Sequence, residues 1–316
     1  MILVVLGHVT TNEFLQLSFS PLRMPLFFFI SGMLYKPREQ YIGRMARALL
    51  WPYLVFALLS FVYWALIEQH FRPIPENTSI LQQFTAIFYP MWHGENSYLM
   101  NSPIWFLPAL FICSCLYNYV LHPLSSKLKI YISLLIALIA YNEFFSRLEL
   151  PLCVPQALAA LPIYALGVSL NKTILNTINS GKLHLNYIAS GLAVGLFAVL
   201  ITLHPGGDLV SRSWTFGSYI SYLILALLSI FALITLCPKR HISILNFIGV
   251  NSLAIMLLHD PVKRVIIQLY SWATAIEIDE ARASAVHSIL ILIILLLVIT
   301  PPVILIKKYC PKLLKI

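Results

Sequence analysis

The chain has 316 residues, of which 59% are hydrophobic and only 10% are charged, and its formal net charge is +9. A mean hydropathy of +0.84 lies far outside the range of water-soluble domains. This composition excludes an ordinary soluble enzyme and predicts an all-α fold, that of a polytopic helical membrane protein.

Apolar runs along the chain predict ten membrane segments. They are Met1 to about Thr10, Leu22 to Tyr35, Ala48 to Ile67, Ile104 to Leu121, Ile130 to Ala140, Pro151 to Leu170, Tyr187 to Leu203, Gly217 to Leu236, Phe247 to about Tyr270, and Ser288 to Ile306. A spanning helix needs about twenty apolar residues, and the first run has roughly half of that number. Either the chain therefore lacks its true N-terminus or its first helix is a stub.

The charges are distributed unevenly between the connections. Counted alternately from the cytoplasm, the connections on that side receive fourteen of the 21 basic residues and a single acid, Glu39. This asymmetry follows the positive-inside rule and predicts a multi-pass protein of the bacterial inner membrane with both termini in the cytoplasm. The basic balance therefore reports topology and contact with lipid, and no nucleic acid partner is predicted.

The longest polar connection runs from Glu68 to Ser102. Long connections tend to be functional, so this one is interpreted as an external lid or a substrate-facing surface. Its side chains for contacting a sugar are Trp92, His93, Glu95 and Tyr98. The alternative is that its aromatic residues belong to the interfacial belt. The whole chain, 1–316, is treated as one membrane-embedded domain with no appended soluble domain.

Two ionisable residues lie in the apolar stretch at the start of the chain. His8 sits inside the first run, and Arg23 lies at the mouth of the second, which Pro21 and Pro25 open. Burying such groups in a bilayer is costly, so they usually face an interior or a cavity. For His8 the alternative is an imidazole that only packs and hydrogen-bonds, and for Arg23 it is a side chain that reaches the headgroups.

A second candidate site lies in the ninth segment, at His259. Asp260 beside it is a group that can orient or charge an imidazole, although adjacent residues on a helix point in different directions. Pro261 is expected to kink the helix here and to open a cavity. The five cysteines and nine histidines are dispersed without the spacing of a disulfide framework or a zinc site, so no metal is predicted.

Five strings in order along the chain carry a resemblance to a known family. They are LVVLGH at Leu3 to His8, MPLFFFISG at Met24 to Gly32, RMARALLWPY at Arg44 to Tyr53, PIWFLPALF at Pro103 to Phe111, and LLHDPV at Leu257 to Val262. The chain resembles acyltransferase family 3, the integral-membrane O-acyltransferases of sugar hydroxyls, and within it the fucose 4-O-acetylase-like members. Family members carry an arginine eleven residues before the histidine, a position that falls before Met1.

The resemblance implies transfer of an acetyl group from cytoplasmic acetyl-CoA to a hydroxyl of a glycan or lipid-linked sugar of the cell envelope. His8 would be the general base or a transient acyl carrier, because the ordinary pKa of histidine lies near the operating pH. Arg23 would stabilise negative charge or hold the sugar, and Ser31 and Trp105 would line the substrate site. Basic residues before the third segment would hold the phosphates of the donor: Arg44, Arg47, Lys36 and Arg38.

Two other interpretations of the same residues stand beside this one. Membrane histidines and arginines also mark substrate pathways, so the chain could be a transporter or export component for a glycan or its precursor. No inverted repeat of broken segments points to that class. The third interpretation is an inactive, truncated homologue of the acyltransferases. For Trp105 and for the phenylalanines at 27–29, the alternatives are an interfacial anchor and lipid-facing packing.

Overall fold

A computed structural model describes residues 1–38, 40–70, 79–89, 98–141, 150–179, 191–192, 194–196, 198, 216–236 and 241–313. Every regular element in these ranges is a helix, which confirms the all-α prediction. The N-terminal elements are α1 (Ile2–Val9), α2 (Glu13–Met33), α3 (Tyr41–Met45), η1 (Ala46–Leu50), α4 (Trp51–Leu66), η2 (Glu68–His70), α5 (Ile80–Ala86), η3 (Ser102–Trp105), α6 (Phe106–Leu116), η4 (Tyr117–Leu121) and α7 (Ser126–Ala140). The C-terminal elements are α9 (Val154–Asn179), α11 (Phe216–Leu236), α12 (Ser243–Val250), α13 (Ser252–Thr274), α14 (Ile278–Ala283), α15 (Ala285–Tyr309) and η5 (Pro311–Leu313).

Five helices of the described residues are long and apolar enough to cross a membrane, and a sixth span results if α12 and α13 count as one. The five are Glu13–Met33, Tyr41–Leu66, Ser102–Leu121, Val154–Asn176 and Ala285–Tyr309. The protein is therefore a polytopic membrane protein, and the count of ten segments stays a prediction. Most of the predicted segment Tyr187 to Leu203 lies outside the described residues.

The second helix begins nine residues earlier than its apolar run predicts. The Asn12 side chain accepts a hydrogen bond from the Leu15 N–H and caps the helix, which then continues to Met33 with Pro21 and Pro25 inside it. The stretch interpreted as a polar connection is thus helical. Its 21 residues give α2 the length of a full span, which the prediction did not.

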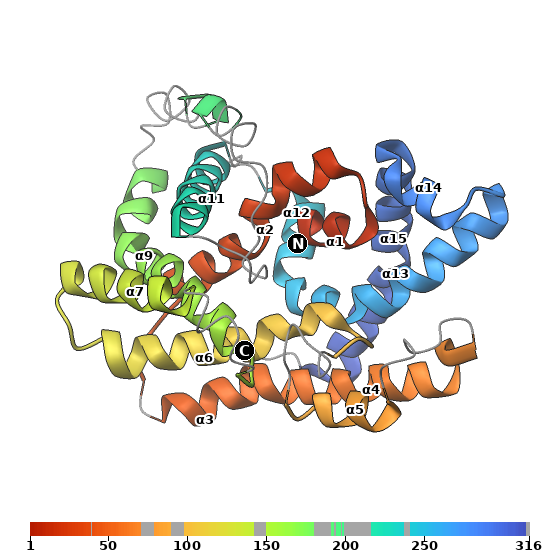
Figure 1. Cartoon of the computed structure of the whole chain (residues 1–316), viewed down its shortest axis with the longest axis horizontal. Coiled ribbons are helices and arrows are strands. Elements are labelled where there is room, and N and C mark those ends of the chain that lie inside the picture. The colour runs from red at the N-terminus through yellow and green to blue at the C-terminus, as the bar shows by residue number, and fades with distance from the viewer. Residues whose placement is uncertain are drawn as a thin grey trace.

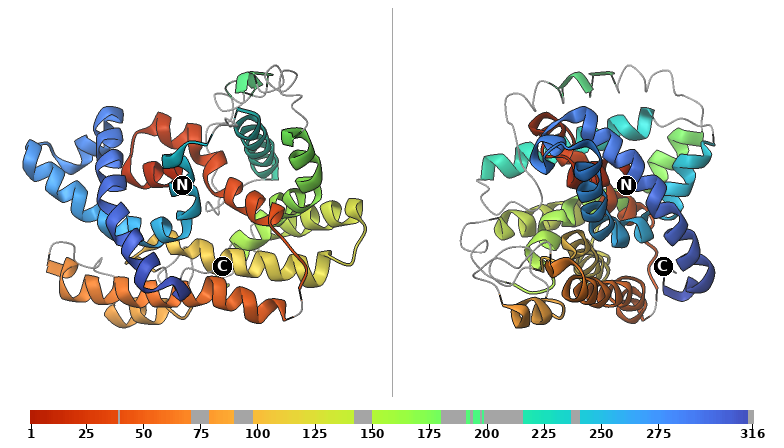
Figure 2. Two further views of the ribbon diagram at one scale, coloured as in Figure 1. Left: turned by 180° about the vertical axis from the view of Figure 1, so that it is seen from behind. Right: turned by 90° about the vertical axis from the view of Figure 1, so that its right-hand side faces the viewer.

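The ninth predicted segment is broken at a position that its proline does not mark. The structure divides it at Asn251 into α12 and α13, whose axes meet at 83°. Pro261 lies inside α13, and the kink expected at this residue stays a prediction. After the bend at Asn251, α13 passes α1 and runs outwards to α14, as Figures 1 and 2 show.

Two groups of buried side chains form the interior. The larger group joins α2, α4, α6, α7, α9 and α11, and the smaller one joins α1 with α12, α13, α14 and α15. Where α2 crosses α9, a side chain at Gly32 or Gly167 would overlap the backbone of the other helix, so only glycine permits this close approach. The N-terminal helix α1 lies between the two groups, near the centre of the view in Figure 1.

Candidate functional site

The two candidate histidines come together although they lie at opposite ends of the chain. The ring centres of His8 on α1 and His259 on α13 are 5.2 Å apart, with the ring planes tilted by 53°. His259 is completely buried and His8 is half-buried, so His8 is on the side of the pair that a substrate can reach. The structure therefore brings the two candidate histidines, His8 and His259, together in one site.

His259 is oriented by its own helix. Its Nδ1 lies 3.1 Å from the carbonyl oxygen of Ile255 and 2.8 Å from that of Met256. A carbonyl can only accept a hydrogen bond, so we assign the ring hydrogen to Nδ1. The opposite nitrogen, Nε2, is then a bare acceptor, and it is buried without a hydrogen-bond partner among the described residues.

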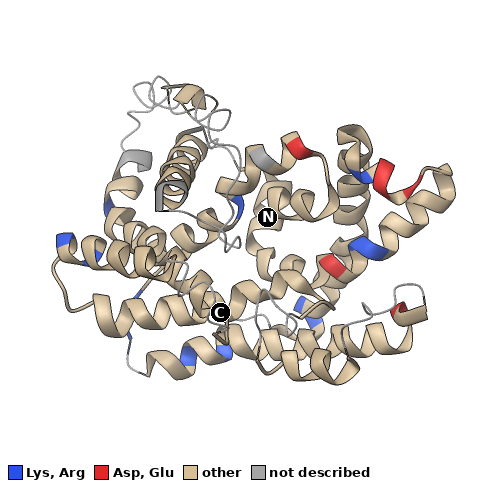
Figure 3. Ribbon diagram, viewed as in Figure 1, with Lys and Arg blue, Asp and Glu red and all other residues tan. Residues whose placement is uncertain are grey.

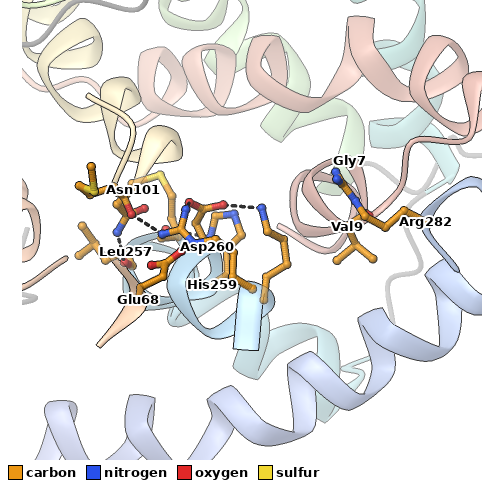
Figure 4. A network of polar contacts seen from close by, with 12 residues as sticks. Gly7, Val9, Glu68, Asn101, Leu257, His259, Asp260 and Arg282 are labelled. Carbon is orange, nitrogen blue, oxygen red and sulfur yellow. Dashed lines mark hydrogen bonds and ion pairs between the residues drawn. The ribbon is translucent and has the colours of Figure 1, made fainter. Parts of the chain in front are cut away.

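Pro261 leaves one backbone carbonyl of α13 without a hydrogen bond inside the helix. Proline has no N–H, so the carbonyl of Leu257, four residues earlier, has no partner within the helix. Asn101 takes up that carbonyl through Nδ2 at 2.9 Å and also donates to Ser60 Oγ at 3.0 Å. Because Ser60 is on α4, this single amide ties α13 to α4 beside the histidine pair (Figure 4).

A buried ion-pair network fastens the next turn of α13. Asp260 accepts from Lys263 at 2.5 Å and from Arg264 Nη1 at 2.9 Å, and Arg264 Nε lies 2.8 Å from Glu68 Oε1. Arg264 also donates from Nη2 to the carbonyl of Met100. With two acids and two bases the network is neutral overall, which limits the cost of burying it.

The network corrects one expectation about the histidine. Asp260 was a candidate to orient His259, but both of its oxygens are engaged with Lys263 and Arg264 instead. The physical reason is helix geometry, since Lys263 and Arg264 follow Asp260 by three and four residues and share its face, whereas His259 points elsewhere. Lys263 in turn lies one helical turn beyond His259, which brings an ammonium group to the side of the pair.

Arg23 holds the end of α1 that carries His8. Its Nη1 donates to Gln16 Oε1 at 2.8 Å, and its Nη2 donates to the carbonyl of Gln16 at 2.8 Å. The Gln16 amide donates in turn to the carbonyls of Gly7 at 2.6 Å and Thr10 at 2.7 Å. A side chain at Gly7 would overlap the guanidinium, so the arginine lies directly against the residue before His8.

A second arginine reaches the same helix end from the C-terminal half of the chain. Arg282, on α14, donates from Nε to the carbonyl of Val9 at 3.0 Å, and its own carbonyl accepts from Thr10 Oγ1 at 3.1 Å (Figure 4). Carbonyls at a C-terminal helix end carry partial negative charge, which cations stabilise. Arg23 and Arg282 thus fix the position of His8 through its backbone.

The remaining predicted substrate residues lie in the packed interior. Ser31, half-buried, is eight residues beyond Arg23 on α2, which is about 12 Å along the helix axis. Trp105 is buried, and its ring meets that of Phe106 at 6.4 Å. Phe28 is fully buried against the same Phe106, so the phenylalanine run packs inside the protein and does not face lipid.

The basic residues predicted to hold the donor are all exposed and lie apart from the histidine pair. They occupy the α2–α3 connection, α3 and η1: Lys36, Arg38, Arg44 and Arg47. These elements pack against α6, whereas the histidines lie between α1 and α13. Among the described residues, no three His, Cys, Asp or Glu side chains are close enough together to hold a metal ion.

Part of the predicted lid falls outside the described residues, including Trp92, His93 and Glu95. Tyr98, its fourth candidate, is buried, and its hydroxyl donates to the carbonyl of Ala57 at 2.6 Å. This tyrosine therefore anchors the connection to α4 where the next residues, Met100 and Asn101, reach α13.

Sequence reasoning missed several residues that build the site: Gly7, Gln16, Glu68, Asn101, Lys263, Arg264 and Arg282. One signal could have found some of them. Lys263 and Arg264 follow Asp260 at the spacing of helical ion pairs, in a segment predicted to lie in the membrane. Glu68, Asn101 and Arg282 contact partners far away in the sequence. Gly7 and Gln16 have nearer partners within α1 and α2, which no local pattern marks.

Comparison with known proteins places the chain in a family. The model of acyltransferase family 3, described as an acyltransferase domain, matches residues 1–307. Neither the curated proteins nor the solved structures include a match. A match over nearly the whole chain, on an all-α fold with five or six candidate spans, establishes membership. The chain belongs to acyltransferase family 3, and its family and helices indicate a membrane acyltransferase.

Proposed function

We propose that this protein takes an acetyl group from cytoplasmic acetyl-CoA and transfers it to a sugar hydroxyl of a cell-envelope glycan or exopolysaccharide. One observation carries the proposal: His8 lies beside His259, with Lys263 and Arg23 close by. Acyl transfer to a hydroxyl needs a group that takes the hydroxyl proton and positive charge or donors for the developing oxyanion. The pair supplies the first, and the cations supply the second.

The half-exposed His8 is the group that contacts the acceptor in this proposal. Arg23 already uses both of its Nη groups to hold α2 and Gln16, so its first role is to position α1. Its charge still acts on the helix end that carries His8. Lys263 lies one helical turn beyond His259 on α13, and its ammonium is held by Asp260, which suits it to stabilise an oxyanion without reorganising.

The distribution of charged residues supports the part of the proposal that concerns the acetyl-CoA donor. In Figure 3 basic positions mark the ribbon around α3 and α7, while acidic positions lie around α13, α14 and the start of α2, where basic positions are present too. Following the positive-inside rule, we assign the α3 side and both termini to the cytoplasm of a bacterial inner membrane. The exposed arginines Arg44 and Arg47 then face the compartment that supplies acetyl-CoA, whose phosphates guanidinium groups bind in pairs.

A second candidate function is transport of a glycan or its precursor without chemistry. The 83° break between α12 and α13 favours it, because broken membrane helices build the substrate sites of many transporters. In this protein the helix after the break also carries a buried histidine, whose ring centre lies 5.2 Å from that of a second histidine. Such a pair can take up the proton that acyl transfer to a hydroxyl releases, so we favour the acyltransferase.

Reconstituted vesicles distinguish the two functions. The purified protein is incorporated into liposomes with labelled acetyl-CoA on one side and a mixture of bacterial envelope oligosaccharides on the other. The proposal predicts label in ester linkage on the sugars, removed by mild alkali, and release of one CoA per ester. Movement of oligosaccharide between compartments without donor and without ester formation would contradict it and support the transporter.

A further inference from the structure

The orientation of the His259 ring leaves this residue a specific role within the proposed acyl transfer, on which the role rests. The ring hydrogen of His259 is on Nδ1 and is shared between two backbone carbonyls. The ring can therefore make one more hydrogen bond, as an acceptor at Nε2. That nitrogen is buried and has no partner among the described residues. A buried hydrogen-bond acceptor in a membrane interior normally has a donor within the protein, because no water is present there to donate to it.

His8 is the side chain placed to satisfy it. The two ring centres are 5.2 Å apart, a separation that permits an N–H···N hydrogen bond when one nitrogen of each ring points towards the other ring. The neighbouring carboxylate of Asp260 is held by Lys263 and Arg264, one on each oxygen. His259 is also wholly buried, so a substrate reaches His8 first.

We infer that His259 is a positioning residue, which accepts the N–H of His8 at Nε2 and thereby fixes the tautomer of His8. The hydrogen-bond chain then runs from the carbonyls of Ile255 and Met256 through His259 to His8. The second nitrogen of His8 keeps its lone pair and faces away from His259, towards the accessible side. His8 acts as the general base, and an imidazole takes the orienting position that a carboxylate occupies in many acid–base sites.

The chemical step balances with the residues and substrates named. The acceptor O–H bond breaks, its proton moves to the free nitrogen of His8, and the oxygen bonds to the carbonyl carbon of the thioester. The C–S bond then breaks, and the leaving thiolate takes the proton from His8. His259 keeps its own hydrogen throughout. Its bond to His8 strengthens while His8 is charged, which is the interval in which the transition state forms.

Two substitutions of similar size test this role. His259→Gln places an amide oxygen near the position of Nε2, whereas His259→Leu offers no acceptor. We expect His259→Leu to lower kcat about 100-fold with little change in KM for the donor, and His259→Gln to recover at least tenfold of that loss. His287, whose Nδ1 pairs with the Tyr270 hydroxyl at 2.8 Å, supplies the control His287→Gln, which should leave kcat unchanged. Wild-type kcat in His259→Leu, or equal loss in folded Leu and Gln variants, would overturn the inference.

Imidazole nitrogen NMR of protein labelled at its nine histidines gives a readout that does not need activity. The signals of His8 and His259 are assigned by their loss in the Gln variants. We expect His259 as the Nδ1–H tautomer and His8 as a single tautomer, which becomes a mixture in His259→Leu. An unchanged His8 signal in that variant would refute the positioning role. If the wild-type protein transfers no acyl group at all, the proposed function fails, yet this measurement still decides whether His259 orients His8.

Discussion

The guanidinium of Arg23 lies against Gly7, the residue immediately before His8, and leaves no room there for a side chain. Glycine at this position thus lets an α2 arginine reach across α1, where Gln16 connects it to the carbonyls of Gly7 and Thr10. This arrangement makes the position of His8 depend on Arg23 and Gln16.

The first prediction follows from that contact. Gly7→Ala should displace Arg23, cost about 1–3 kcal/mol of stability as overpacking does, and lower acyl transfer by misplacing His8. Thermal unfolding in detergent and the transfer rate measure the two effects. Gly249→Ala, on α12, is the matched control, because nothing lies within 4 Å of the added carbon and alanine favours a helix. A Gly7→Ala protein as stable and active as this control would contradict the described contact.

The second prediction concerns the carbonyl that Pro261 leaves free. Asn101→Ala should cost about 1–3 kcal/mol, because the buried Leu257 carbonyl loses its donor. In a Pro261→Ala background the helix supplies an N–H to that carbonyl, so the same substitution should cost less. A double-mutant cycle on unfolding free energies measures the difference. Strictly additive effects would show that Asn101 and Pro261 do not act on one carbonyl.

The third prediction tests the donor site. Replacing Arg44 and Arg47 together by alanine should raise KM for acetyl-CoA about tenfold or more, since each charge-assisted hydrogen bond contributes about 1.5–3 kcal/mol. Both side chains are exposed, so stability should hardly change. The control replaces Lys307 and Lys308, also exposed and basic, near the end of α15. An equal rise in KM for both pairs would indicate general attraction and no specific site.

Local sequence patterns predicted the class of the protein and singled out the two histidines as candidates. Composition and apolar runs were sufficient for the all-α membrane fold, because lipid requires helices that satisfy their own backbone. His8 and His259 stood out as ionisable groups in apolar segments. That they face one another was not predictable, because the contact depends on how α13 leaves the bend at Asn251.

Other errors came from giving one residue type too much weight. Pro21 and Pro25 suggested a helix beginning near residue 22, yet Asn12 and Glu13 form a local capping signal nine residues earlier. Pro261 drew attention to its own position, and no residue type marked the 83° bend at Asn251. No sequence pattern marked Gln16 and Asn101. Their side-chain amides donate hydrogen bonds to backbone carbonyls that come within reach only in the folded chain.

The central claim is that His8 removes the proton of the acceptor hydroxyl during acyl transfer. Its most direct test is the rate of labelled acetyl transfer to envelope oligosaccharide by the reconstituted wild-type protein and by His8→Gln, with His241→Gln as an exposed-histidine control. The account predicts a loss of about 10²–10⁴-fold for His8→Gln alone, with an unchanged unfolding temperature. Transfer by a folded His8→Gln protein at the wild-type rate would contradict it.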